Sequence, residues 1–349
     1  MSERILTLIA LIALATPAAP ARAQAFPEGI GSIVRDTLEN VRGVARYQQG
    51  REEQTDRQTK TVRIGANGEL SLGNVAGDIV VTRANGNEVT VEIVKTARAR
   101  TADEAREMLG LVEVTVSERQ GRADVKTVYP SDERRNNRRN INVSAAYTVS
   151  APAGTRLTVS SVSGSIKVTD IKGDLTLNSV SGSVRIASAG HIATAKSVSG
   201  NVEIVDTQVD GEVEAQSVSG NVIARKISAR QLTLGSISGE ITVQDVQCER
   251  VESHSISGNV EYSGVLAKSG RYEFQSHSGD VRLTVTGGTG FELEANTFSG
   301  ELRSDLPLKM DRSDSDRKGR QRALRGVWGD GSAVVNITTF SGNVVIAKR

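Results

Sequence analysis

Four acidic residues in the middle of the chain are of the types that perform acid and base catalysis: Glu203, Asp206, Asp210 and Glu214. Paired carboxylates at a suitable separation supply the proton donor and the base in glycoside hydrolysis. These four fall within repeating strands, however, where outward positions are ordinarily polar. We therefore expect solvated side chains here, and we assign no catalytic residue.

Histidine and cysteine are too scarce for a metal centre or a catalytic triad. The histidines are His191, His254 and His277, and the one cysteine is Cys248. Structural zinc sites need four such ligands, and a lone cysteine has no partner for an internal disulfide. We expect His277 to face the core, the other two histidines to lie near turns, and Cys248 to be a buried or turn thiol. No metal and no cofactor are expected, and the chain is expected not to be an enzyme.

A nine-residue sub-repeat raises the question of a calcium-binding β-roll. The turns of such a roll need the pattern GGxGxD, in which aspartate and backbone carbonyls ligate the ion. Here the turns read SGxV, and aspartate takes the variable place only at Asp174 and Asp280. The pattern therefore argues against a calcium-binding β-roll.

The sequence DERRNNRRN places four guanidinium groups between two predicted strands. They are Arg134, Arg135, Arg138 and Arg139. A hairpin loop that carries them is a candidate anion-binding loop for the phosphates of lipid headgroups or lipopolysaccharide. The alternative is a solvated loop whose charge is partly neutralised by Asp132 and Glu133.

Composition limits the class of protein that must position these residues. The chain has 349 residues, of which 38% are hydrophobic, 24% are charged and 34 are glycine. These values exclude a multi-span membrane protein and a disordered polar chain. The formal net charge of +2 argues against a nucleic-acid binder, and the aromatic content of 3% offers little for stacking on sugars.

The first 60 residues predict export. An apolar run at residues 5–15 follows Arg4, and the small-residue site Ala21-Arg22-Ala23 follows the run, which is typical of a secretory signal peptide over residues 1–23 that is cleaved near Ala23. Residues 24–60 predict an amphipathic helix at 26–46 and a polar linker at 48–60. The protein is then periplasmic, or at the cell surface or extracellular.

Residues 61–150 predict a β-rich N-terminal part or cap. Alternating apolar residues predict strands near residues 62, 70, 79 and 89, and two further strands at 112–116 and 125–129 that pair through a turn at Gln120 and Gly121. Another strand is expected at 141–149. One short helix is expected at 101–109, because Thr101 and Glu104 have the spacing of a capping box.

From residue 151 to 349 the chain repeats itself. Nine tetrapeptides of the type SVSG, SISG, SHSG or TFSG end in the structural repeat glycines Gly164, Gly182, Gly200, Gly220, Gly239, Gly258, Gly279, Gly300 and Gly342. They are 18 to 21 residues apart except for a last interval of 42, which holds a polar insert at 303–326. Repeats of this length predict an all-β fold, a single-stranded parallel β-solenoid (β-helix) of stacked 18–21-residue coils, with the β-rich N-terminal part and one or two short helices.

Each early coil is made of two similar half-turns with apolar residues at fixed offsets. We expect these to face a shared core: Ile166, Val168, Ile171, Leu175, Leu177, Val180, Val184, Ile186, Ala189, Ala193, Ala195 and Val198. The repeat glycines are expected to serve corners that need a positive φ. The serines of the tetrapeptides are expected to form two ladders, one on each side of an apolar ladder.

These repeats, the lead-in APAGTRL at residues 151–157 and the closing TFSGNVVI at 339–346 resemble the bacterial putative-adhesin β-strand-repeat family, a domain of unknown function. The resemblance covers residues 61–349. It implies the solenoid fold and leaves the activity open. The sequence departs from the family pattern in the N-terminal extension at 26–60, in His191 at a glycine position and in the polar insert.

The resulting hypothesis is a non-catalytic extracytoplasmic scaffold or adhesin-like binding module that presents a β-solenoid surface. Its partner would be an unknown envelope or surface component, whether protein, polysaccharide or anionic lipid, and not nucleic acid. One alternative is a carbohydrate-binding or carbohydrate-active protein of the cell envelope. Another is a self-assembling envelope fibre that associates through the C-terminal solenoid end, where the last strand, at residues 344–347, is expected to be open.

Overall fold

The structure is a computed structural model that describes residues 52–130, 141–310 and 322–349. The chain divides into two units, Met1–Arg51 and Glu52–Arg349, and all described residues belong to the second. The predicted signal peptide, the amphipathic helix and the four arginines of the candidate anion-binding loop lie outside the described residues. Within them, no helix is long and apolar enough to cross a membrane.

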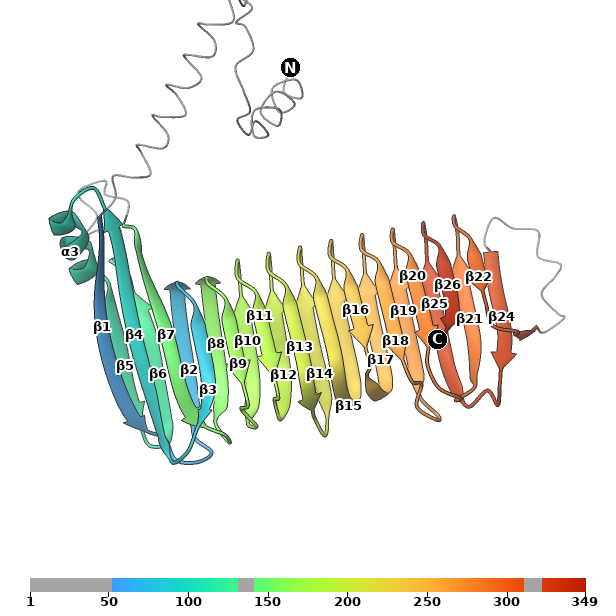
Figure 1. The fold of residues 1–349 in the computed structure, drawn as a ribbon, viewed down its shortest axis with the longest axis horizontal. Coiled ribbons are helices and arrows are strands. Elements are labelled where there is room, and N and C mark those ends of the chain that lie inside the picture. Colours follow the sequence, from blue (N-terminus) through green and yellow to red (C-terminus); the bar gives the residue numbers. More distant parts are fainter. Residues whose placement is uncertain (1–51, 131–140, 311–321) are drawn as a thin grey trace, which may run out of the picture. The chain divides into compact units, whose positions relative to one another are not determined.

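The described residues form one mixed β-sheet of 26 strands and a single helix (Figure 1). The N-terminal elements are β1 (Glu52–Arg63), β2 (Glu69–Ala76), β3 (Ile79–Ala84), β4 (Glu88–Ala99), α3 (Ala102–Leu111), β5 (Glu113–Arg119), β6 (Arg122–Val128) and β7 (Val143–Pro152). The all-β class is confirmed. The sheet is mixed rather than all-parallel, because antiparallel pairs such as β1–β4 and β5–β6 occur near its ends.

The coils continue the sheet towards the C-terminus. Their first strands are β8 (Arg156–Ser163), β9 (Ile166–Thr169), β10 (Asp174–Ser179), β11 (Val184–Ala187), β12 (His191–Ser197), β13 (Val202–Gln208), β14 (Glu212–Ser217), β15 (Val222–Ser236) and β16 (Ile241–Gln244). They are followed by β17 (Gln247–Ser255), β18 (Val260–Gly264), β19 (Arg271–Ser276), β20 (Val281–Val285), β21 (Phe291–Thr297), β22 (Leu302–Ser304), β23 (Lys309–Met310), β24 (Arg322–Trp328), β25 (Ala333–Thr339) and β26 (Val344–Lys348).

The N-terminal strands continue directly into the repeats. Strands β1, β4 and β7 pair antiparallel in that order, whereas β2 and β3 run parallel to β8 and β9 and so form one more coil. The linker predicted at residues 48–60 is wrong from residue 52 onward, because these residues belong to β1. Among the described strands β1 pairs with β4 alone, and an edge strand with mostly exposed side chains does not need an apolar sequence.

Helix α3 has the cap that the sequence predicts. The Thr101 Oγ1 accepts a hydrogen bond from the Glu104 N–H at 3.2 Å, and the Glu104 carboxylate accepts one from the Arg100 N–H at 3.2 Å. The helix packs its buried face into a small second core with residues of β4 and β7. It thereby covers apolar side chains at the N-terminal end of the sheet.

Within the coils, equivalent strands stack in register. Val184 of β11, for example, lies between Ile166 of β9 and Val202 of β13. Stacked parallel strands are ~4.8 Å apart, so each coil adds one rung to every side-chain row. Rows of buried Val, Ile, Leu and Ala side chains fill the interior, as the apolar offsets predict.

Three of the residues predicted to face the core are exposed instead. Val180 and Val198 are 48% and 44% exposed, and Ala193 is also exposed. The first two follow the buried corner serine, and successive side chains of an extended chain point in opposite directions. Ala193 is displaced by a register shift between β10 and β12, which puts Ile192 into the core in its place.

The order of the last coils differs from the order of the chain. Strand β26 lies between β20 and β22, and β25 lies between β19 and β21, so the final tetrapeptide inserts between the two that precede it. Strand β24 then pairs antiparallel with β21 at the outer side of this coil. The expectation that the last strand is an open end is therefore wrong, because β26 is paired on both sides.

Candidate functional site

The first serine or threonine of each tetrapeptide turns into the molecule. These side chains are at most 6% exposed: Ser161, Ser179, Ser197, Ser217, Ser236, Ser255, Ser276, Thr297 and Thr339. The Ser217 hydroxyl accepts a hydrogen bond from the Gly220 N–H at 2.9 Å and donates one to the Gly200 carbonyl of the neighbouring coil at 2.9 Å. The Ser197 and Ser236 hydroxyls make the same two contacts, so at these three corners the hydroxyl closes its own corner and fastens it to the neighbouring coil. Ser161 Oγ, by contrast, is buried without a hydrogen-bond partner.

The repeat glycines are required by close approach and not by a positive φ. None of the nine has a positive φ. A Cβ on Gly200 would lie 2.1 Å from the Gly182 carbonyl oxygen, and one on Gly239 would lie 2.0 Å from that of Gly220. The tight corner stacking therefore excludes any side chain at these positions.

Positive φ values occur at the opposite corner of the coil, at residues other than glycine. They are Asp170, Ser188, Asp206, Lys226 and Asp245, with φ between 47° and 60°. Each lies six residues after a repeat glycine. The sequence signal, aspartate at three of the five places, matches the tolerance of aspartate for this conformation.

Because the corner serine points inward, the second residue of each tetrapeptide points outward. The side chains in this row are, in stacking order, Val75, Val162, Val180, Val198, Val218, Ile237, Ile256, His277, Phe340 and Phe298. We call this row the apolar ladder. The ladder holds nine of the twelve large hydrophobic side chains that are exposed in the described part of the chain.

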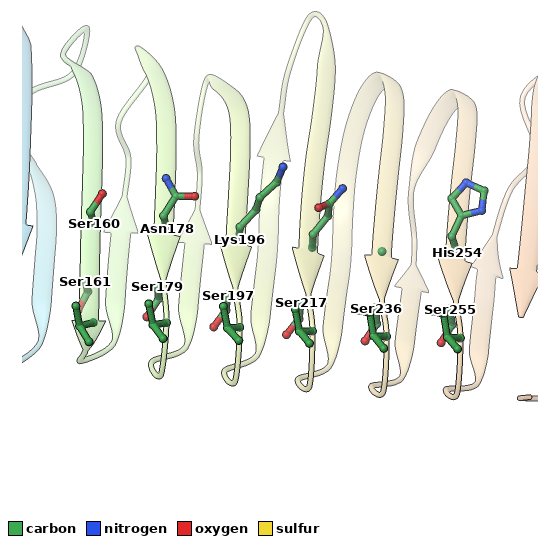
Figure 2. Close-up of a pocket in the computed structure, with 18 of the residues that line it drawn as sticks. Ser160, Ser161, Asn178, Ser179, Lys196, Ser197, Ser217, Ser236, His254 and Ser255 are labelled. Carbon is green, nitrogen blue, oxygen red and sulfur yellow. The ribbon is translucent and has the colours of Figure 1, made fainter. Parts of the chain in front are cut away.

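The apolar ladder is one wall of a long groove. The groove has a volume of about 1250 Å³. Its floor is the outward row that immediately precedes the corner serines, and Figure 2 shows Ser160, Asn178, Lys196 and His254 of that row on successive coils. Gly73, Gln216, Gly235, Gln275 and Thr338 complete the floor. The groove thus has one apolar wall and one polar, partly cationic floor.

Aromatic rings form one end of the ladder. His277 and Phe340 stack with centroids 4.9 Å apart, and Phe340 stacks on Phe298 at 4.8 Å. The expectation that His277 faces the core is wrong, because it occupies an outward rung. Phe340 lies between His277 and Phe298 because the last coil inserts between the two coils that precede it.

Lysine and histidine provide the only ionisable side chains among the thirty described residues that line the groove. Lys126 lies at the Val75 end, where β6 pairs with β2, and Lys196 lies in the floor, 3.1 Å from Glu214. The two histidines are His254 and His277. Within the described parts of the chain, the lining holds no aspartate or glutamate, so the groove presents positive charge beside apolar surface.

The four acidic residues considered for catalysis each have a cationic neighbour. Glu203 lies 3.2 Å from Arg185, and Asp206, Asp210 and Glu214 lie 3.8, 3.4 and 3.1 Å from Lys226, Arg230 and Lys196. Their closest charged partners are thus basic groups on the outer surface. This arrangement fits the solvated surface expected from the sequence.

Cys248 is a buried thiol. It is 2% exposed, and burial raises its pKa to about 11. Such a thiol stays protonated at neutral pH and is a poor nucleophile or metal ligand. Groups of three or more His, Cys, Asp and Glu side chains placed to hold a metal ion do not occur among the residues that the structure describes.

The sequence contains a periodic signal for the groove, but the prediction that this row faces the core is wrong. The central Val, Ile or Phe of each tetrapeptide is plainly periodic. Because successive side chains of a strand face opposite sides, a shift by one residue moves such a row from the core to the surface. The preceding serine or threonine is buried at every corner, so the residue that follows it faces outward. The candidate anion-binding arginines lie outside the described residues, so their loop stays a prediction.

The stacked coils and the continuous serine and glycine rows define a repeat β-protein with a solenoid-like sheet. The chain belongs to the Toastrack DUF4097 family, whose sequence model matches residues 67–225, 206–303 and 267–347. No curated protein matches the sequence.

Several solved structures are similar at low identity. A "putative adhesin" from Bacteroides fragilis is 13% identical, with 83% of this chain and 97% of that chain covered and a TM-score of 0.41. A "putative lipid binding protein" from Parabacteroides distasonis is 13% identical, with 84% and 97% covered and a TM-score of 0.45. A "putative adhesin" from Parabacteroides merdae is 11% identical, with 83% and 96% covered and a TM-score of 0.38.

Proposed function

We propose that this protein is a non-catalytic, extracytoplasmic binding module of the adhesin-like scaffold type, and that its binding surface is the groove beside the apolar ladder. The observation that carries the proposal is the collection of nine exposed hydrophobic side chains along one groove. Large exposed apolar patches on soluble proteins mark interaction sites, because water contact with them is unfavourable. The extracytoplasmic location rests on the predicted signal peptide.

The repeat geometry favours binding over catalysis. Seven successive coils contribute an exposed aliphatic side chain, from Val75 to Ile256, so the ladder presents a uniform apolar wall to an elongated partner. A catalytic site would instead need a few converging polar groups at one place. The alternative of a carbohydrate-active protein gains little support, since carboxylates are missing from the lining among the described residues.

The test is photo-crosslinking in the cells that produce the protein. A photoreactive phenylalanine analogue would replace Val218 in the ladder or, as the matched control, Ile223, which faces outward on another strand row of the same coil. We expect adducts, detected by mass spectrometry, from position 218 and not from position 223. Adducts from neither position, or equal adducts from both, would contradict the proposal.

A further inference from the structure

The backbone groups of the ladder residues are used in hydrogen bonds between neighbouring coils. The Val180 N–H donates to the Ser161 carbonyl at 3.0 Å, and the Ser199 N–H donates to the Val180 carbonyl at 2.8 Å. The same pattern repeats along the stack. A peptide bound as an added strand obtains its affinity from main-chain hydrogen bonds at an open edge, and the groove offers no such edge.

The apolar wall of the groove favours instead a ligand that is apolar along its length. From Val75 to Ile256 the ladder presents seven aliphatic side chains in succession without a polar rung. An alkyl chain needs no hydrogen-bond partner and gains roughly 0.8 kcal/mol for each CH₂ that it removes from water. The aliphatic rungs are therefore matched to an extended hydrocarbon.

The dimensions of the groove agree with a long ligand. Ten rungs at ~4.8 Å per coil extend over roughly 43 Å. One acyl chain spans about half of the ~30 Å hydrocarbon core of a bilayer, so it is shorter than the ladder and fits along it. The volume of about 1250 Å³ also exceeds the ~300–1,000 Å³ that is usual for small-molecule pockets.

The positive charge of the groove lining favours a ligand with an anionic headgroup. Lys126 and Lys196 place ammonium groups beside the groove, and no acidic side chain lines it among the described residues. Lys126 lies at the Val75 end of the ladder, whereas Lys196 has Glu214 at 3.1 Å. An anionic headgroup at the Lys126 end would gain a charge-assisted contact while its chain extends along the valines.

We infer that the groove holds the acyl chain of an anionic lipid as a monomer, with the headgroup at Lys126 and the chain along the apolar ladder. The inference rests on the proposed function and narrows it to one class of ligand. A second copy of this chain is the competing occupant, and the experiment distinguishes the two.

The experiment uses a variant that fills the groove. A Cβ on Gly235 would have its nearest neighbour, the Gln216 Cγ, at an ordinary 3.5 Å, so Gly235→Phe places a ring in the floor without a backbone clash. Gly288→Phe is the matched control, because Gly288 has open space around it and does not line the groove. If Gly235→Phe does not fold, as judged by circular dichroism, the exposed pair Val218→Asn and Ile237→Asn serves the same purpose.

The full chain and its variants would be incubated with vesicles of phosphatidylglycerol or phosphatidylcholine and re-isolated by gel filtration. Native mass spectrometry would then detect any lipid that stays bound. Palmitate, hexadecanol and hexadecyltrimethylammonium would compete with a fluorescent fatty acid in solution. We expect phosphatidylglycerol to remain bound to the protein. The affinity for palmitate should be at least about tenfold higher than that for the cationic analogue. Gly235→Phe should lower the affinity for palmitate by a similar factor, and Gly288→Phe should not. Lys126→Gln should weaken palmitate and leave hexadecanol unchanged.

Absence of a lipid adduct, equal affinity for the cationic analogue, or full binding by Gly235→Phe would overturn the inference. Concentration-dependent dimers that Gly235→Phe abolishes, without lipid binding, would identify a second copy as the occupant and would also overturn it. Protein adducts from position 218 without any lipid would overturn it while leaving the binding module intact. The two proposals can therefore fail separately.

Discussion

At the scale of single residues, the corner serine is the group on which the site depends. At Ser197, Ser217 and Ser236 its hydroxyl satisfies a buried N–H and a buried carbonyl at once, and a buried polar group without a partner is costly. Because this serine side chain is buried, the side chain that follows it in the extended chain faces outward. One residue type thus stabilises the stack and creates the apolar ladder.

Ser217→Ala should lower the free energy of unfolding by about 1–3 kcal/mol, because the Gly220 N–H loses its acceptor inside the protein. Ser219→Ala is the matched control. It changes the exposed serine of the same tetrapeptide, and it should alter stability by less than about 0.5 kcal/mol. Urea denaturation measures both values. Equal effects at the two positions would mean that the corner hydroxyl does not fasten the coils.

The opposite corner offers a second test, at Lys226, whose φ is 52°. Lys226→Gly and Lys226→Ala both remove the exposed pair with Asp206, but only glycine adopts this conformation without strain. We expect the glycine variant to be the more stable of the two by about 1 kcal/mol, which reverses the usual order in regular structure. Thermal denaturation compares them. A more stable alanine variant would show that this corner relaxes to a negative φ.

At the scale of elements, Lys95 connects β1, β4 and α3. Its side chain is buried, its ammonium donates to the Leu109 and Val112 carbonyls at the end of the helix, and it pairs with Asp56 of β1 at 2.9 Å. The hydrogen bond from Lys95 holds the pKa of Asp56 below its usual range. A lysine that is buried with three such partners fixes the helix end against the first edge strand.

The lowered pKa gives a pH dependence with a definite sign. A carboxylate whose pKa is depressed on folding stabilises the folded state above about pH 4, and this contribution is lost as the pH falls through the folded pKa. Asp56→Asn should therefore reduce stability at pH 7 and flatten its decline on acidification. Urea denaturation from pH 7 to 3 tests this. Asp210→Asn, which removes a fully exposed carboxylate, is the control for the loss of one acidic side chain, and an unchanged slope in Asp56→Asn would refute the argument.

At the scale of the whole described unit, the last repeat is not the last rung. Thr338 of β25 lies beside Gln275 on one side and beside Asn296 on the other. Val344 of β26 lies in the same way between Val281 and Leu302. The final ten residues therefore belong to the interior of the stack. Their removal should destabilise the unit and would not expose a new docking end.

Paired cysteines can verify this order. Gln275→Cys with Thr338→Cys places the two residues on adjacent strands, within the Cα separation of about 4.4–6.8 Å that a disulfide allows. The control is Gln275→Cys with Asn296→Cys, in which β25 lies between the two cysteines, roughly 9.6 Å apart. Mild oxidation should cross-link the first pair and not the second, as read by non-reducing electrophoresis. The reverse outcome would restore the order of the chain.

Much of the fold could be predicted from the sequence. The tetrapeptide spacing predicted stacked coils, the apolar offsets predicted buried rows such as Ile166 and Val168, and the Thr101–Glu104 capping box predicted α3. These are local signals, because each depends on a period of a few residues or on a contact within one turn. The same signals could not place β1, whose polar sequence becomes a strand only by pairing with β4.

The sequence by itself determined that the chain repeats, that its repeats form β-strands and that each tetrapeptide makes a corner. Only the tertiary structure decided which side of the corner each residue faces, since that depends on hydrogen bonds to the neighbouring coil. It also decided that the last coil inserts before the one at Thr297, because strand order is set by pairing between segments far apart in the chain. The groove depends both on the side that each corner residue faces and on the order of the coils. For that reason the periodic Val, Ile and Phe residues alone did not reveal it.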